Sequence, residues 1–332
     1  MTGPTRRRFI GISAAAAGLA LLPPGGRAGT AAGRIAWRGV ALGAPAEMIL
    51  HHGDRMQAER LIARAVAEIA RLERIFSLYR ADSALSQLNR FGALAAPPAE
   101  LVAMLEACRR FRTLGAATFD PTVQPLWLLH AKHFAAPGAD PAGPARAEVA
   151  AALKLVGFDR VAFDAGRIAF GQRGMALTLN GIAQGFITDR IVDMLRAGGM
   201  TSTLADLGEI RAIGARDGGE PWRVGISGGR GAEARTLDLV DRAVATSGTE
   251  GFRFAGPASP SHLLDPRTGT SARRYRSVSV VANDATTADA LSTAFSFLAP
   301  EAIETVLGAL PGIEAHLFLP DGRHLALGRG RA

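Results

Sequence analysis

Cysteine is almost absent from this 332-residue sequence, in which Cys108 is the only one. A single cysteine excludes an intrachain disulfide framework and any cysteine-rich zinc or iron–sulfur site. No run of eighteen or more uninterrupted apolar residues occurs, which excludes a polytopic membrane protein. Lysine and tyrosine are also scarce, with two of each. The remaining composition, 48% hydrophobic and 20% charged, is typical of a globular chain and excludes a disordered or fibrous one.

The first 32 residues have the three parts of an export signal. Arg6, Arg7 and Arg8 precede an apolar stretch over residues 11–22, and two prolines follow it. Paired arginines before a moderately apolar core resemble a twin-arginine signal, the alternative being a disordered basic tail. We therefore expect a twin-arginine signal peptide over residues 1–32, one domain over residues 33–332, and a soluble periplasmic protein without a membrane span in the mature chain.

Removing this leader weakens the case for nucleic-acid binding. The whole chain carries a formal charge of +8, and residues 1–32 hold four arginines and no acid, so the rest carries 34 minus 30, or +4. No basic cluster interleaved with aromatic residues follows the leader. We expect no nucleic-acid partner.

Apolar periodicity predicts four main helices and several short strands. The helices are expected over 55–76, 99–114, 182–197 and 287–298. Strands are expected over 161–163 and 168–170, which form a hairpin, and over 176–179, 222–226, 236–240, 277–282 and 313–319. Residues 134–146, rich in proline, glycine and alanine, are the candidate internal linker. Because strands and helices do not alternate regularly, the prediction is an α+β fold with mostly antiparallel sheets and packed helices.

Three generic motifs give weaker hypotheses. Residues 225–229 satisfy the G-x-S-x-G pattern of a hydrolase nucleophile, but a strand pattern follows where a helix is required. Residues 229–234 fit the loose dinucleotide fingerprint and lack a helix for the same reason, so a hairpin turn is the preferred interpretation. The histidine pairs 51–52 and 130/133 have no third metal-ligating residue at ligand spacing, which favours surface or packing histidines.

Five segments together carry the residue types that a nucleotide site needs: 76–89, 118–126, 179–189, 261–269 and 287–294. Asp289 and Thr293 are four apart at the start of a predicted helix, so their oxygens share one face. A carboxylate with a hydroxyl suits Mg²⁺ that is bound jointly with phosphates. Each of these residues also has a purely structural interpretation, such as Asp289 acting only as an acid in the first turn of its helix.

Other residues of these segments fit the same chemistry. Gly181 and Gly185 bracket a helix start, where backbone N–H groups favour anions. His262 is a potential general base near neutral pH, and Tyr79 and Phe119 are aromatic rings that stack on a flat ligand. Alternatively, His262 is a turn histidine and Tyr79 a core residue.

The five segments, taken in order over about residues 40–308, resemble the ApbE family of FAD:protein FMN transferases. The Ser-His-x-x-Asp-Pro-Arg-Thr-Gly block at 261–269 and the Ala-Asp-Ala-x-x-Thr block at 288–293 carry most of the resemblance. Within the family, residues 178–185 and 204–210 are most similar to the NosX branch, which is associated with maturation of the nitrous-oxide reduction system.

The resemblance implies a fold like the T-fold and a reaction that splits the FAD pyrophosphate. FMN is then joined through its phosphate to a Thr or Ser hydroxyl of an acceptor protein, and AMP leaves. It implies catalytic roles for His262, as the base, and Asp289. It implies metal contacts for Asp289, Ser292, Thr293 and the carbonyl of Gly181, with Mg²⁺ as the cofactor. The implied contacts to FAD, the substrate, are Leu42, Tyr79, Thr118, Phe119, Asp120, Thr178, Gln184 and Leu263.

Two positions depart from many relatives, which have Asp in place of Thr178 and Lys or Glu in place of Gln184; the NosX-like branch shares both changes. The same branch implies an acceptor flavoprotein with a periplasmic domain. Two further functions fit the same residues. One is an Mg²⁺-dependent FAD pyrophosphatase that uses water as the acceptor. The other is a carrier that binds FAD without reacting.

Overall fold

A computed structural model describes residues 33–229, 234–255 and 259–328. The predicted leader, residues 1–32, lies outside the described residues and stays a prediction. In the described part of the chain, every helix is too short or too polar to cross a membrane.

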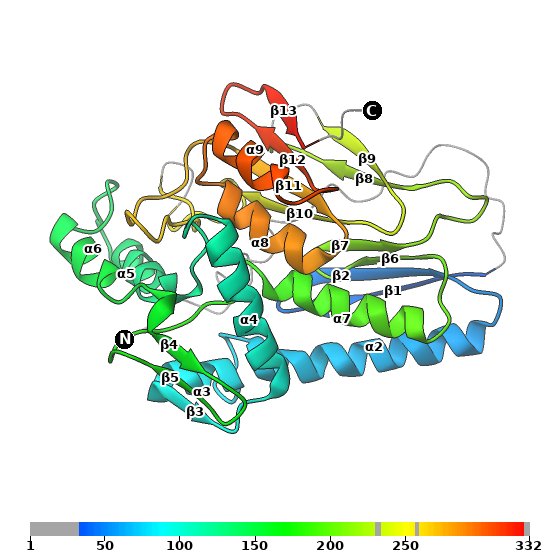
Figure 1. The fold of residues 1–332 in the computed structure, drawn as a ribbon, viewed down its shortest axis with the longest axis horizontal. Helices are drawn as coiled ribbons and strands as arrows, with labels where there is room; N and C mark the ends of the chain where they lie inside the picture. The colour runs from blue at the N-terminus through cyan, green and yellow to red at the C-terminus, as the bar shows by residue number, and fades with distance from the viewer. Residues whose placement is uncertain (1–32, 230–233, 256–258, 329–332) are drawn as a thin grey trace.

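The centre of the fold is one eight-stranded sheet in which every neighbouring pair is antiparallel. Its strand order is β1-β2-β6-β7-β10-β11-β12-β13 (Figure 1). The strands are β1 (Arg34–Ala41), β2 (Ala44–His51), β6 (Thr203–Asp206), β7 (Ile210–Ile213), β10 (Ala243–Gly248), β11 (Ser277–Ala282), β12 (Glu314–Phe318) and β13 (His324–Leu327). The predicted α+β class with mostly antiparallel sheets is confirmed.

Both faces of this sheet are covered, so alternate side chains of one strand enter different cores. In β2, Met48 and Leu50 join the main core and Ile49 joins a second one. The hairpin of β8 (Trp222–Ile226) and β9 (Arg235–Leu239) covers the second face. All six residues of β11 are buried, which explains why its sequence contains no charged residue.

Helices cover the main face of the sheet (Figure 1). They are α2 (Arg55–Phe76), α7 (Ala183–Ala197), α8 (Ala285–Phe295) and α9 (Pro300–Gly308). The long helix α2 begins at Asp54, whose side chain accepts the N–H of Gln57, and buries a stripe that includes Leu61, Ile69 and Leu72. This stripe is the amphipathic pattern from which the helix was predicted.

A second group of elements lies at one end of the sheet (Figure 1). It comprises α3 (Ala84–Phe91), β3 (Ala93–Ala95), α4 (Ala99–Leu114), η2 (Pro121–Val123), α5 (Gln124–Ala135), α6 (Arg146–Leu153), η3 (Phe158–Arg160), β4 (Val161–Phe163) and β5 (Arg167–Phe170). Strands β3, β5 and β4 form a small antiparallel sheet, and β4–β5 is the predicted hairpin. Cys108 is buried in α4.

Several boundaries differ from the prediction. Helix α8 begins two residues earlier and ends three residues earlier than 287–298, because Asp284 caps its first turn. Residues 134–146 form a loop but do not separate domains, because α5 and α6 on either side of it pack together through Leu126 and Ala152. The interpretation of this loop as an internal linker is therefore wrong. The hairpin β8–β9 also excludes a nucleophile elbow at 225–229, since a strand follows the motif.

The strand predicted over 176–179 is wrong, although the alternating burial behind it is real. Leu177 and Leu179 are buried, yet among the residues that the structure describes no strand pairs with the segment. The side chain of Asn89 takes the place of a neighbouring strand. Its Oδ1 accepts the N–H of Leu177 at 2.7 Å, and its Nδ2 donates to the Leu177 carbonyl at 2.8 Å.

We expect Asn89→Ala to lower the free energy of unfolding by about 2 kcal/mol, since two partly buried backbone groups of Leu177 lose their partner. Urea unfolding followed by circular dichroism measures the change. The control is Gln87→Ala on the same helix, where an exposed hydrogen bond to Asp82 is lost and a change below about 0.5 kcal/mol is expected. Equal losses in both variants would contradict this role of Asn89.

Candidate active site

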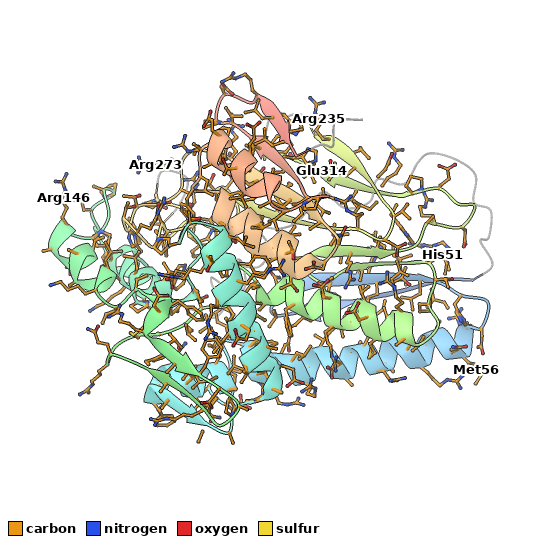
Figure 2. All side chains as sticks on the ribbon, in the orientation of Figure 1. His51, Met56, Arg146, Arg235, Arg273 and Glu314 are labelled. Atoms are coloured by element: carbon orange, nitrogen blue, oxygen red, sulfur yellow. The ribbon has the colours of Figure 1, made fainter. Side chains whose placement is uncertain are left out.

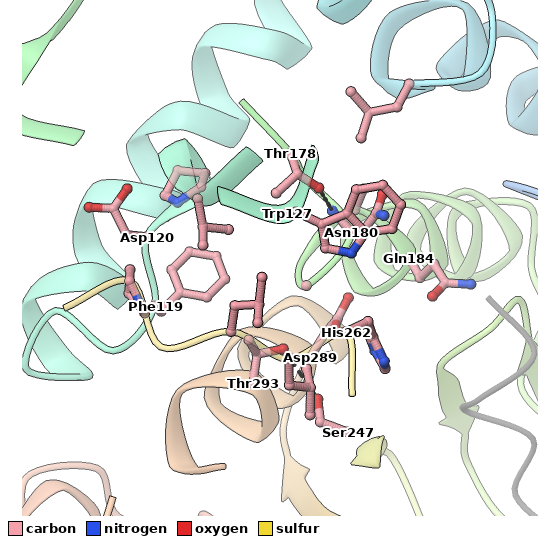
Figure 3. A pocket seen from close by; sticks show the side chains of 18 of the residues that line it. Phe119, Asp120, Trp127, Thr178, Asn180, Gln184, Ser247, His262, Asp289 and Thr293 are labelled. Carbon is pink, nitrogen blue, oxygen red and sulfur yellow. Dashed lines mark hydrogen bonds between the residues drawn. The ribbon is translucent and has the colours of Figure 1, made fainter. Parts of the chain in front are cut away.

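One cleft collects side chains from both groups of elements and encloses about 1250 Å³, including the solvent at its mouth. Of the thirteen residues predicted for the site, all except Ser292 line it, and Figure 3 draws several of them around one space. They are Leu42, Tyr79, Thr118, Phe119, Asp120, Thr178, Gly181, Gln184, His262, Leu263, Asp289 and Thr293. The cleft is large enough for a dinucleotide-sized ligand.

Leu42 reaches the cleft from the tight turn between β1 and β2. Leu42 and Gly43 have φ values of 48° and 83°, the left-handed pair that a two-residue hairpin of this type requires. A leucine is strained in this conformation. Its N–H donates a 2.7 Å hydrogen bond to Oε1 of Glu73 on α2, which holds the turn in place.

The starts of α7 and α8 meet at the floor of the cleft. The N–H of Gly185 on α7 donates a 3.0 Å hydrogen bond to Oδ2 of Asp289 on α8. A Cβ atom on Gly185 would lie 2.3 Å from the backbone oxygen of Ala285, so only glycine allows this approach. The pairing puts the carboxylate of Asp289 against the first turn of the neighbouring helix, where exposed N–H groups favour an anion.

A second carboxylate fixes the start of α8. Asp189 accepts the N–H groups of Ala285 and Thr286, each at 2.8 Å, and also contacts Arg211 at 2.8 Å. Burial raises the pKa of Asp189, and the Thr286 hydroxyl and the Arg211 charge oppose the rise. Asp189 therefore joins α7 to α8. Its hydrogen bonds satisfy two backbone N–H groups that have no partner within α8 because they lie at the start of that helix.

Oxygen atoms gather around Asp289, which is 3% exposed. The hydroxyl of Thr293 lies one helical turn away, and a Cβ built on Gly181 would be 2.9 Å from that hydroxyl oxygen. Ser247 on β10 lies 3.2 Å from the Thr293 hydroxyl and 2.8 Å from that of Ser292. Ser292 thus contacts the site through Ser247 rather than lining the cleft itself.

Burial and neighbouring negative charges raise the pKa values of Asp289 and of a carboxyl group near it. Burial raises the pKa of Asp289 to about 7, and the charge of Asp189 adds to the rise while the Gly185 N–H opposes it. Burial also raises the pKa of Glu209 well above its usual value, with the charges of Asp289 and Asp206 adding to it. A bound cation would favour the ionised forms, so the residues present fit a metal ion. The described residues contain no group of three His, Cys, Asp or Glu side chains arranged for a metal, so hydroxyl and carbonyl oxygens would complete the donor set.

His262, from the 261–269 segment, lines the same cleft as this oxygen cluster (Figure 3). Its Nδ1 lies 3.1 Å from the carbonyl oxygen of Phe252, which can only accept, so we assign the proton of the neutral ring to Nδ1. The Nε2 atom then keeps its lone pair. Burial lowers the pKa of His262, which keeps the ring neutral and able to accept a proton at neutral pH.

Comparison with known proteins identifies the family of this fold and cleft. The family model described as "ApbE family" matches residues 42–317. This chain belongs to the ApbE family. Its predicted enzyme class, flavin transferase, is confirmed.

Curated relatives cover most of this chain and of their own length. The FAD:protein FMN transferase of Treponema pallidum (strain Nichols) is 32% identical over 277 residues, 76% of this chain and 75% of the relative. A FAD:protein FMN transferase of Klebsiella pneumoniae (strain 342) is 26% identical over 304 residues, 87% of this chain and 90% of the relative.

Solved structures of the family have the same fold. The ApbE protein of Thermotoga maritima superposes with a TM-score of 0.77 at 28% identity, covering 89% of this chain and 97% of its own. The Pseudomonas stutzeri flavinyl transferase ApbE, in its apo form, gives a TM-score of 0.74 at 26% identity, covering 89% and 95%.

The aromatic and amide side chains of this ApbE-family cleft lie along its length. Tyr79 is 49% exposed; burial raises its pKa and a hydrogen bond with Asn180 opposes the rise. Gln184, in contrast, is 8% exposed, and in the described part of the chain its Nε2 makes no hydrogen bond. A buried amide nitrogen without a partner is free to donate to a ligand. The rings of Phe119 and Trp127 line the same cleft.

Two of the predicted contact residues use their side chains to hold the protein itself together. The Thr118 hydroxyl lies 2.9 Å from the carbonyl oxygen of Ala294 on α8, joining the end of α4 to that helix. The Asp120 Oδ2 accepts from Arg112 at 3.0 Å and from the N–H of Phe158 at 3.1 Å.

Some cleft residues had no predicted role. Asp189, Asn180 and Glu209 were noted as parts of motifs, but nothing local indicated that Asp189 caps another helix or that Glu209 is buried beside Asp289. Ser247 lay in a strand that was not predicted. The only signal for Glu209 in the sequence was its place within residues 204–210, which resemble the NosX branch.

We expect Gly185→Ala to destabilise the protein by about 2–3 kcal/mol, because the added methyl group meets the backbone oxygen of Ala285, which cannot move cheaply. Thermal and urea unfolding measure the loss. Gly308→Ala is the matched control, since nothing lies within 4 Å of a Cβ there, and it should be neutral or stabilising by up to about 1 kcal/mol. A Gly185 variant as stable as the Gly308 variant would exclude the close helix approach.

Proposed function

We propose that this ApbE-family chain splits FAD with the help of Mg²⁺ and transfers FMN to a Thr or Ser hydroxyl of an acceptor protein, releasing AMP. The observation that carries the proposal is that His262, whose ring stays neutral, lines the same cleft as the Asp289–Thr293 oxygen face. A base and a cation site within reach of one bound phosphate are what transfer to a hydroxyl requires.

Asp289, Thr293 and the carbonyl of Gly181 are the residues that would hold Mg²⁺, with Ser247 and Ser292 supporting the Thr293 hydroxyl. Their oxygens are hard ligands, and few protein ligands suit an Mg²⁺ ion that also binds phosphate. When bound, the ion would neutralise charge on the pyrophosphate oxygens. Glu209 lines the same cleft, and because its pKa is raised, a cation bound there would favour its ionised form.

His262 acts as the general base in this proposal. Its Nε2 accepts the proton of the acceptor hydroxyl while the hydroxyl oxygen attacks the phosphorus on the FMN side. That P–O bond forms as the bond to the AMP oxygen breaks, and the departing AMP carries the electron pair. The Phe252 carbonyl stabilises the imidazolium that results, because it accepts the Nδ1 hydrogen.

The rest of the cleft would hold FAD. Tyr79 and Phe119 are aromatic side chains suited to a flat ligand, and Leu42, Thr178 and Leu263 line the same cleft. Gln184 supports this assignment with its unpartnered Nε2, which would donate to an oxygen of FAD. Gln184 has a neutral amide and Thr178 a hydroxyl at the two positions where many relatives have charged side chains.

The acceptor and the compartment rest on the sequence alone. The twin-arginine pattern over residues 1–32 supports export to the periplasm. The resemblance of residues 178–185 and 204–210 to the NosX branch supports an acceptor flavoprotein with a periplasmic domain that belongs to nitrous-oxide reduction.

The direct experiment combines the chain, FAD, Mg²⁺ and a candidate periplasmic acceptor domain, followed by denaturing electrophoresis and mass spectrometry. A fluorescent acceptor band with the added mass of FMN, absent with a chelator or when the acceptor threonine is replaced by alanine, supports the proposal. Accumulation of FMN and AMP without an adduct favours the pyrophosphatase, and FAD that stays whole favours the carrier.

We expect Asp289→Ala and Asp289→Asn each to reduce FMN transfer at least about 10³-fold and to abolish Mg²⁺ binding in calorimetry. Only the asparagine keeps an acceptor for the Gly185 N–H, so only the alanine variant should lose stability. The control is Asp321→Asn on the exposed β12–β13 turn. Normal Mg²⁺ binding by either Asp289 variant would remove this residue from the metal site.

We expect His262→Ala to bind FAD with unchanged affinity and to transfer FMN about 10²–10⁴-fold more slowly. The wild-type rate should fall only when the pH drops below about 6.5, the ordinary pKa of histidine. The lowered pKa of His262 means that Nε2 is protonated only in more acidic solution. The unfolded chain binds that proton more readily, so His262 also makes stability rise with pH in this range. Free imidazole should restore part of the rate; a variant with the wild-type pH profile would show that another group is the base.

A further inference from the structure

A cluster of aromatic side chains connects the wall of the cleft to the residue that holds His262. Its members are Trp127, His130 and Phe134 of α5 together with Phe252 and Phe254. Helix α5 lies beside α6, at the end of the molecule that Arg146 and Arg273 mark (Figure 2). Trp127 also lines the cleft, where Figure 3 shows it together with His262.

Trp127 contacts two rings of the segment at 252–254. The centroid of its indole lies 6.3 Å from that of the Phe252 ring at an interplanar angle of 26°, and 5.5 Å from that of the Phe254 ring at 55°. Both separations are typical of favourable aromatic pairs. The half-buried ring of Phe252 therefore lies among three aromatic side chains: Trp127, Phe254 and His262.

Phe252 holds His262 through both its ring and its carbonyl group. The two rings meet edge to face, with centroids 6.0 Å apart and an interplanar angle of 76°. The carbonyl oxygen accepts the Nδ1 hydrogen at 3.1 Å and the backbone N–H of His262 at 3.2 Å. Because the ring and the carbonyl belong to one residue, a shift of the Phe252 ring would also shift the acceptor of the Nδ1 hydrogen.

The aromatic contacts tie this arrangement to α5. Residues 252–254 pair with residues 260–262, since Arg253 forms an antiparallel bridge with Ser261 and the N–H of Phe254 donates to the Pro260 carbonyl at 3.3 Å. These bonds align the two stretches with each other but not with the helix. Trp127 and Phe254 supply that link, because both pack in the cluster around the fully buried Leu126 of α5.

The position of the Phe252 carbonyl decides which nitrogen of His262 can act as a base. In a neutral imidazole, Nε2 accepts a proton only when the ring hydrogen is on Nδ1, and the partner of Nδ1 selects that tautomer. If the carbonyl moves away, the ring also populates the tautomer with its hydrogen on Nε2. That tautomer has no lone pair on Nε2 for the proton of a hydroxyl.

We propose that Trp127 is a positioning residue for the base: its indole, stacked on Phe252, keeps the Phe252 carbonyl where it holds the Nδ1 hydrogen of His262 and leaves Nε2 able to accept a proton. The inference rests on the proposed transferase function. The role is separate from any contact between the indole and FAD, because it acts through Phe252 and His262 alone.

The first test is nitrogen-15 NMR of the histidine-labelled chain without FAD, which shows which ring nitrogen of His262 carries the hydrogen. The signals of His262 are those that disappear in His262→Ala. We expect the hydrogen on Nδ1 in the wild type and a population with the hydrogen on Nε2 in Trp127→Leu, which keeps an apolar side chain but has no ring. Trp127→Phe, which can still stack on Phe252, should keep the wild-type tautomer.

A second variant tests the same link from its other end. Phe252→Leu keeps the carbonyl but removes the ring that the indole contacts, so we expect the same change of tautomer as in Trp127→Leu. The two substitutions together should cost no more than either one alone, because they break one contact. A double variant whose losses simply add would contradict the link through Phe252.

In transfer assays, Trp127→Leu should lower kcat for FMN transfer about 10- to 100-fold, since a misplaced base slows the chemical step. The KM for FAD should change less than kcat, and Trp127→Phe should recover most of the rate. The control is Phe134→Leu, which removes a ring that packs on His130 and Phe254. In the described part of the chain this ring has no contact with Phe252, so the tautomer and kcat should stay as in the wild type even if the melting temperature falls.

Three results would overturn the inference: a wild-type tautomer in Trp127→Leu, the same change of tautomer in Phe134→Leu, or a higher KM for FAD in Trp127→Leu with unchanged kcat. Failure of the transferase function itself gives a different result. The NMR experiment contains no FAD, so the tautomer would still depend on Trp127 while no acceptor gains FMN.

Discussion

The close approach of α7 and α8 is the constraint on which the site depends. Gly185 lets the two helix starts meet, its N–H binds Asp289, and Asp189 caps α8 from α7. These contacts hold a carboxylate in a buried place where its charged form is disfavoured, and burial raises its pKa to about 7. Such an arrangement persists only if the surrounding packing determines it, and here the rigid sheet below both helices does so.

The cleft holds buried acids whose ionised forms a cation would favour, while His262 in the same cleft stays neutral. The charges of Asp289 and Asp206 add to the effect of burial on the pKa of Glu209, whereas the Phe252 carbonyl and burial keep the imidazole in one neutral tautomer. This asymmetry separates two tasks of phosphoryl-type transfer. One side stabilises negative charge on phosphate, and the other takes up a proton. Neither task needs a large movement of the protein.

Helices with strong amphipathic stripes and the strands β11 and β12 could be predicted from the sequence, whereas the other strands of the central sheet were not. Helices α2 and α4 begin and end where their apolar spacing predicted. An apolar stripe that repeats over more than ten residues stays recognisable even where single positions depart from it. Strands β6 and β7 are four residues each and buried on both faces, so neither has a readable alternation. Residues 176–179 have the alternating burial of a strand, but their backbone pairs with the side chain of Asn89. Hydrophobic periodicity cannot predict a partner of that kind. The site residues came from motif resemblance; Ser247 and the capping role of Asp189 arise only when distant segments meet.

The segment of residues 260–273 carries His262, the base in the proposed transfer. A transferase must hold two substrates on opposite sides of one reacting bond, and the base must lie between them. His262 lines the cleft together with Leu263 and Leu264 of the same segment. Its Nδ1 donates to the Phe252 carbonyl, so Nε2 is the ring atom left to take up the proton of the incoming hydroxyl in the proposed transfer.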